Sequence, residues 1–128
     1  MSEEEKSLRD QWEFRYRPAE VLGAAQKMLV HHQERLIWWE KEMDKAENDL
    51  KEKGFEYRQE HRSMGSDLVI VGDPQLAKRV SDCKNMIKEH QKRINLYETW
   101  VRALQGKAER EPKTDLVLKI DDIVFFGM

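Results

Sequence analysis

The stretch that decides the fold runs from Leu22 to Leu50 and reads LGAAQKMLVHHQERLIWWEKEMDKAENDL. Its seam positions recur at alternating steps of three and four residues, which is the period of a coiled coil. These positions are Leu22, Ala25, Leu29, His32, Leu36, Trp39, Met43, Ala46 and Leu50. Pro18 suits the first turn of a helix, and Gly54 suits the position after its last turn. We therefore predict a first long helix over residues 18–53.

A second stretch, from Leu76 to Leu104, repeats the pattern. Its seam positions are Leu76, Val80, Cys83, Ile87, His90, Ile94, Tyr97, Val101 and Leu104. Asp73 is a good N-cap, Pro74 a good first residue and Gly106 a good terminator, so a second helix is predicted over residues 74–106. Because the two seams have the same length, an antiparallel arrangement pairs them layer by layer. We expect a mainly α fold built on an antiparallel two-helix coiled-coil hairpin.

Short β segments are predicted near both termini, where residues that favour strands are concentrated. In the N-terminal part, residues 1–17, aromatic and charged residues alternate from Trp12 to Arg17. The C-terminal part, residues 107–128, contains the β-prone run from Leu116 to Phe126. Since the second helix returns to the start of the first, we expect these two segments to pair as antiparallel strands.

The connection between the helices, residues 54–73, is long for a compact protein, and such connections are usually functional or internally structured. Phe55 and Tyr57 alternate with charged residues, and the run from Leu68 to Val71 is β-prone. These features predict a small β-hairpin at the tip. The alternative is a helical extension that continues through Arg62.

The composition limits the class of protein. The chain has 128 residues, of which 38% are charged, with a mean hydropathy of −0.87 and a net charge of −2. This length suits one domain over residues 1–128. No apolar run is long enough to span a membrane, no secretory leader opens the chain, and the lone Cys83 excludes an internal disulfide. We expect a cytoplasmic protein that carries no cofactor.

The residues able to do chemistry form no recognisable catalytic motif, so we expect a non-enzymatic protein. His32 and His90 occupy seam positions, but neither follows an acidic residue three positions earlier, as the ligands of a di-iron bundle do. We interpret both as polar seam residues that set the register of the helices. Cys83, also on the seam, is interpreted as a small hydrophobic residue. A metal-binding helical bundle that uses these three residues is the alternative.

The second predicted helix has a basic face, which raises a further alternative. This face consists of Lys78, Arg79, Lys84, Lys88 and Lys92. A nucleic-acid backbone could lie along it, and such binding would depend strongly on salt. However, aromatic residues for base stacking are not interleaved, and the net charge gives no general attraction to nucleic acid. We prefer the interpretation that this is a solvated helix face.

One flank of the predicted hairpin carries more large apolar side chains than two helices can bury. In the heptad frame this flank comprises Val21, Met28, Trp38, Met86, Leu96 and Trp100. Exposed apolar surface of this kind marks interfaces, so we expect self-association, with two hairpins forming a four-helix bundle. The alternative is that the terminal segments fold back over the flank, and the two arrangements are compatible.

These features favour a non-enzymatic protein–protein interaction module. An oligomeric coiled-coil adaptor, an assembly scaffold or a small inhibitor, such as phages and mobile elements encode, would have this character. We expect the partners to be a second copy of the chain and another protein, with no nucleic acid and no membrane. A nucleic-acid-associated protein and a metal-binding bundle remain the alternative functions.

Overall fold

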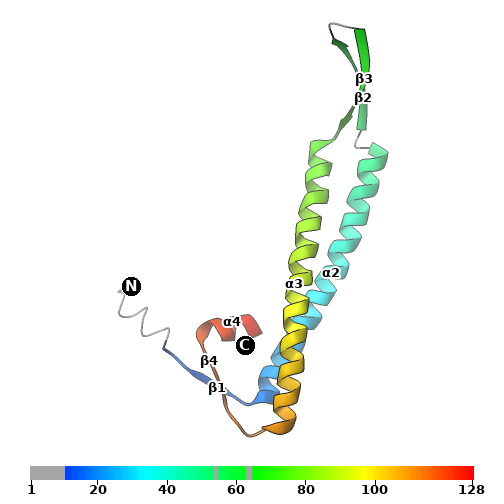
Figure 1. Cartoon of the computed structure of the whole chain (residues 1–128). Coiled ribbons are helices and arrows are strands. Elements are labelled where there is room, and N and C mark those ends of the chain that lie inside the picture. Colours follow the sequence, from blue (N-terminus) through cyan, green and yellow to red (C-terminus); the bar gives the residue numbers. More distant parts are fainter. Residues whose placement is uncertain (1–10, 54, 63–64) are drawn as a thin grey trace. The chain divides into compact units, whose positions relative to one another are not determined.

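The computed structural model describes residues 11–53, 55–62 and 65–128, and two long helices dominate it (Figure 1). The contacts divide the chain into two compact units, one formed by residues 1–33 and 92–128 and the other by residues 34–91. We call them the terminal unit and the tip unit. In chain order the elements are β1 (Phe14–Tyr16), α2 (Pro18–Lys53), β2 (Phe55–Arg62), β3 (Gly65–Gly72), α3 (Pro74–Arg110), β4 (Leu116–Leu118) and α4 (Ile120–Phe126).

The predicted mainly α hairpin is confirmed, because each unit contains a part of α2 packed antiparallel to a part of α3. Every predicted seam position on both helices is buried or half-buried. The small residues Ala25, Ala46 and Cys83 are at most 1% exposed, which suits close approach of two helix backbones. The knobs-into-holes geometry of a coiled coil and the single-domain assignment stay predictions.

The bounds of α2 agree with the predicted residues 18–53, and α3 begins at Pro74, as predicted. The amide N–H of Gln75 donates to the Asp73 carboxylate at 2.9 Å, which is the N-cap that the sequence indicates. The predicted end of this helix at Gly106 is wrong, because α3 continues to Arg110. A Lys107–Glu111 ion pair of 2.9 Å supports the extra turn, and Pro112 then prevents further helix.

The predicted pairing of the terminal segments is also confirmed. β1 and β4 are antiparallel, with Phe14 opposite Leu118, Arg15 opposite Val117 and Tyr16 opposite Leu116. The expectation of a strand from Leu116 through Phe126 is wrong beyond Leu118, since the chain turns into α4.

The start and end of α4 explain this turn to helix. The backbone N–H of Lys119 donates to the Asp122 carboxylate at 2.9 Å, which caps the first turn. Gly127 ends the helix with a φ of 66°, in the left-handed region that glycine adopts at low cost. Local capping therefore overrides the β propensity of Ile123, Val124 and Phe125.

The core of the terminal unit lies where these segments cover the long helices. Its buried members are Val21, Ala25, Val101, Leu104, Leu118 and Phe126. Half-buried side chains from β1, β4 and α4, including Phe14, Tyr16 and Leu116, pack around them. The two-stranded ribbon, which is marginal in isolation, is thus supported by helix surface.

In the tip unit, β2 and β3 form the predicted β-hairpin, in register from Phe55 opposite Gly72 to Arg62 opposite Gly65. The alternative of a helix extended through Arg62 is therefore wrong. The β-branched run at residues 69–71 favours extended backbone, and this outweighs helix continuation. Within the described part of the chain, neither long helix has a segment apolar enough to cross a membrane.

Candidate interaction surface

The terminal unit contains a stack of three rings around Tyr97, whose side chain is almost fully buried. The Tyr97 ring stacks on His32, with centroids 5.5 Å apart, and on Phe125, with centroids 4.6 Å apart. Its hydroxyl donates a hydrogen bond to the carbonyl oxygen of Phe125. Burial raises the pKa of Tyr97, and the positive charge of Arg93 partly opposes this. The stack ties α4 to both long helices.

Trp100 extends this aromatic cluster to the surface. Its indole lies edge-to-face against Phe126 at 5.5 Å and contacts Phe125 at 6.4 Å between ring centroids. The side chain nevertheless remains 42% exposed. One part of the indole is therefore held by α4, while the rest faces solvent.

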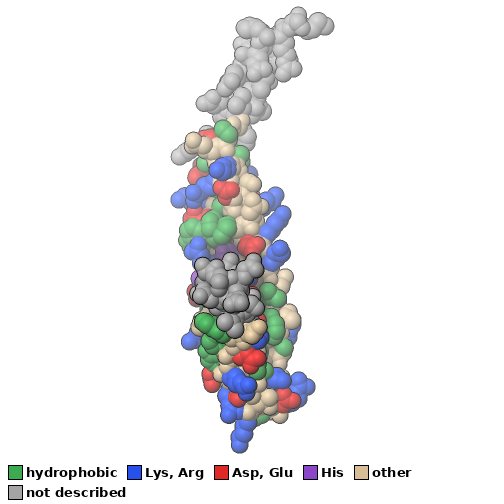
Figure 2. Space-filling view, turned by 90° about the vertical axis from the view of Figure 1, so that its left-hand side faces the viewer, with side chains coloured by type: hydrophobic (Ala, Val, Ile, Leu, Met, Phe, Trp, Pro, Cys, Tyr) green, Lys and Arg blue, Asp and Glu red, His purple; other side chains and the backbone are tan. Residues whose placement is uncertain are grey.

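A pocket of about 280 Å³ lies beside Trp100. Its lining is mostly apolar and includes Ala103, Leu104 and all three residues of β4, with Lys107 and Asp122 as the charged members. Val117 of β4 is 47% exposed, and Leu96, one helical turn before Trp100, is 43% exposed. We call Leu96, Trp100 and Val117 the terminal apolar patch. Figure 2 shows hydrophobic side chains reaching the surface among charged ones.

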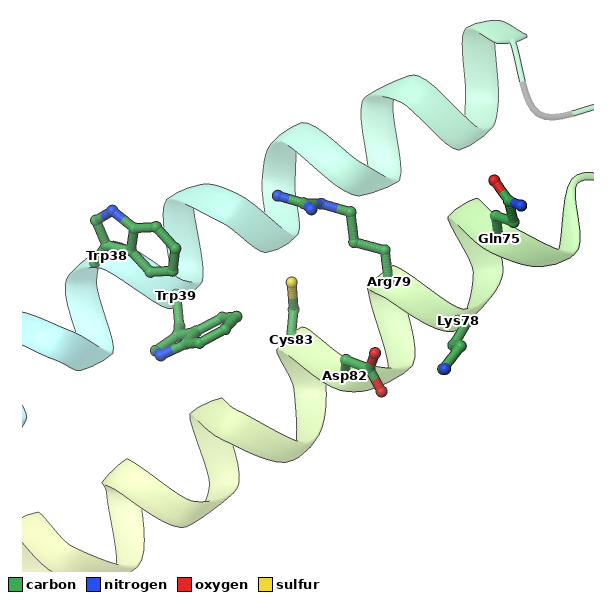
Figure 3. Close-up of a pocket in the computed structure, with 7 residues that line it drawn as sticks. All are labelled: Trp38, Trp39, Gln75, Lys78, Arg79, Asp82 and Cys83. Atoms are coloured by element: carbon green, nitrogen blue, oxygen red, sulfur yellow. The ribbon is translucent and has the colours of Figure 1, made fainter.

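A second pocket, of about 340 Å³, lies in the tip unit and is more polar (Figure 3). Arg79 and Cys83 extend from α3 toward α2, and Arg79 forms an ion pair with Glu42. The Trp38 and Trp39 rings are perpendicular at 4.8 Å, and the Arg35 guanidinium lies 4.7 Å above Trp38. The Trp39 ring and the Arg35 guanidinium therefore already cover part of the exposed Trp38 indole.

The six residues of the predicted flank differ in how far their side chains are exposed in the structure. Trp38, Leu96 and Trp100 are exposed, as expected, and Met28 and Met86 are half-buried. Val21 is fully buried in the terminal core, so its expected place on an accessible surface is wrong. The alternative, in which terminal segments fold back, holds at this residue. The role of the other five in self-association stays a prediction.

His32 is half-buried, and His90 and Cys83 are buried, at the seam of the two long helices. His32 stacks on Tyr97 and lies edge-to-face to His31 at 5.2 Å. Over the described residues, no group of three His, Cys, Asp or Glu side chains is placed to hold a metal ion. A buried Cys83 also lacks the exposure that a reactive thiol needs.

The basic face of α3 is accessible to solvent. Lys78, Arg79, Lys84, Lys88 and Lys92 are all exposed, and Arg79 is already paired with Glu42. Exposure suits a solvated face and a phosphate-binding face equally, so nucleic-acid binding by these residues stays a prediction.

Two features of the surface were missed from the sequence. Val117 was assigned to a strand without a role, and the contribution of Phe125 and Phe126 as supports for Trp100 depends on α4, which was not predicted. The signals for α4 were Asp122 three residues after Lys119 and Gly127 directly after the aromatic pair.

Comparison of the chain with protein-family models, with curated proteins and with solved structures found no match.

Proposed function

We propose that the chain is a non-enzymatic protein–protein interaction module that self-associates and also binds another protein. The observation that carries this proposal is the terminal apolar patch, whose three large side chains are each 42–47% exposed. Two of them, Trp100 and Val117, line a mostly apolar pocket. Contiguous apolar surface around a pocket is characteristic of interfaces. Adaptor, assembly scaffold and small inhibitor are uses that fit such a module, and a cytoplasmic location fits its single cysteine and high charge.

Trp100 has the properties of an interface anchor. Tryptophan is enriched among the residues that dominate binding energy, and this indole is held between Phe125, Phe126 and α3. Because its orientation is restrained before binding, less side-chain entropy is lost when a partner covers it. Charged residues beside the pocket, Lys107 and Asp122, provide a polar rim.

The test measures molar mass against concentration by light scattering or sedimentation for the wild type and for Trp100→Ser. We expect the wild type to shift from 15.3 kDa toward twice that mass as concentration rises. Trp100→Ser should weaken the association at least about tenfold.

Ile37→Ser is the matched control, because Ile37 is 53% exposed but belongs to the tip unit. This variant should associate like the wild type. A mass that stays at 15.3 kDa over the whole range would contradict self-association. Equal weakening by both substitutions would contradict the assignment to the terminal patch.

A further inference from the structure

We propose that a second copy of this chain docks on the free edge of β4, so that the two ribbons join across a twofold axis into a four-stranded antiparallel sheet in the order β1-β4-β4-β1. The inference rests on the proposed self-association and names the contact that mediates it. β1 and β4 form a two-stranded sheet, and no third strand pairs with either of them among the described residues. An unpaired strand edge is a template for another strand.

The sequence of β4 and its flanks is complementary to itself. Residues 115–119 read Asp-Leu-Val-Leu-Lys. Antiparallel pairing centred on Val117 places Asp115 opposite Lys119 of the second copy and Val117 opposite its own counterpart. The leucines at 116 and 118 then face each other on the core side. A twofold contact requires a surface that complements itself, and this strand provides one.

The edge of β1 does not meet the same requirement. Pairing the segment Glu13–Arg17 with itself about its centre places Arg15 opposite Arg15. Like charges directly opposite each other destabilise a strand pair, and Arg15 is exposed on the same face as Val117. The two edges of the ribbon are therefore not equivalent, and the charges favour β4.

The ion pairs already present within one copy extend naturally into the proposed sheet. Lys119 lies 3.5 Å from Glu13, and Arg17 lies 3.5 Å from Asp115. After docking, each outer row would run Glu13, Lys119, then Asp115 and Arg17 of the second copy, with alternating sign throughout. Exposed pairs contribute little affinity. Their main effect is to select this register over others.

The apolar contribution comes from Val117 and the pocket beside it. All three β4 residues line the pocket that also contains Trp100. Side chains of the same copy therefore do not fill the space beside this strand. Pairing would cover Val117, which is 47% exposed, with its counterpart. The free edge of β4 thus adjoins the terminal apolar patch, on which the proposed function rests.

The decisive experiment mixes two charge variants, Asp115→Lys and Lys119→Asp, and measures molar mass by sedimentation. In either variant alone, pairing about Val117 places like charges at both ends of the contact, so we expect association at least about tenfold weaker than wild type. An equimolar mixture restores opposite charges at both ends and should recover the association as a heterodimer. A merely structural role of these residues would not produce recovery on mixing.

Cross-linking tests the register. In a Cys83→Ala background, Val117→Cys should form a disulfide-linked dimer under mild oxidation, because directly opposite residues lie within reach of a disulfide. Arg15→Cys is the control, since Arg15 faces the same side but is separated from its counterpart by both β4 strands. It should cross-link much more slowly.

Three results separate the proposals. Failure of the mixture to recover, or cross-linking of Arg15→Cys as fast as Val117→Cys, would overturn the β4 contact. If Trp100→Ser still weakens association in that case, the proposed function stands and the copies meet elsewhere. A wild type that is monomeric at every concentration would overturn both.

Discussion

Gly127 is the residue whose backbone the fold constrains most directly. Its φ is 66°, and a Cβ added there would lie 2.9 Å from the Met28 sulfur. Gly127→Ala should lower the free energy of unfolding by about 1–3 kcal/mol, because the new residue is both strained and crowded. Chemical denaturation followed by circular dichroism measures this loss.

Gly23 provides the opposite case at the same scale. It lies within α2, and a Cβ added there meets nothing within 4 Å. Gly23→Ala should therefore raise the free energy of unfolding by roughly 0.5–1 kcal/mol. If both substitutions changed stability by the same amount and in the same direction, the described geometry of the Gly127 cap would be wrong.

The Tyr97 hydroxyl makes a second residue-scale prediction, on pH. Burial raises the pKa of Tyr97 in the folded state. The neutral phenol therefore stabilises the fold below the unfolded-state pKa of about 10, and this contribution is lost as pH rises through the folded-state pKa. Tyr97→Phe should cost about 0.5–1.5 kcal/mol at neutral pH through the lost hydrogen bond to Phe125.

The same variant should lose less stability than the wild type in alkaline solution, because it has no phenol to ionise at this position. Urea denaturation at neutral pH and at pH values above about 10 measures both curves. Parallel loss of stability in the two proteins would show that the Tyr97 hydroxyl is not titrating within the core.

At the scale of elements, α4 is the segment that completes the terminal core. Phe126 is 3% exposed and contacts Trp100, so Phe126→Ala should lower the free energy of unfolding by about 3–5 kcal/mol. Val124, on the same helix, is 73% exposed, and Val124→Ala should change it by less than about 0.5 kcal/mol. Similar losses for the two variants would contradict the packing of α4 on the helices.

The elements that were predicted correctly carry strong local signals. The seam period identified both long helices, and Pro18, Asp73 and Pro74 located their starts, because these residues suit helix starts wherever the rest of the chain lies. The β-hairpin between the long helices was recognisable from the β-branched run before Gly72. These features depend on sequence neighbours alone.

The elements that were missed depend on competition between signals. Gly106 was read as a terminator, but a glycine inside a helix costs only about 1 kcal/mol, and the Lys107–Glu111 pair and the following turn favour continuation. In residues 120–126, β-branched and aromatic residues favour a strand, whereas the Asp122 and Gly127 caps favour a helix. Val21 is buried in a cluster that includes Leu118 of β4 and Phe126 of α4, which agrees with the alternative that the terminal segments fold back over the flank.

At the scale of the whole molecule, the chain covers part of its own apolar surface and leaves another part exposed for a partner. The terminal segments bury Val21, yet Leu96, Trp100 and Val117 stay exposed. We expect self-association to depend on Trp100 and on the β4 edge, and Ile37→Ser in the tip unit to leave it unchanged.

The most direct test of the β4 contact is the rate of amide hydrogen exchange in residues 116–118 as a function of protein concentration. If a second copy pairs with this edge, the exchange of its outward-facing amides should slow markedly as the protein passes from monomer to dimer, while α2 amides already bonded within the helix should change little. Exchange in β4 that is the same at low and high concentration would contradict the account.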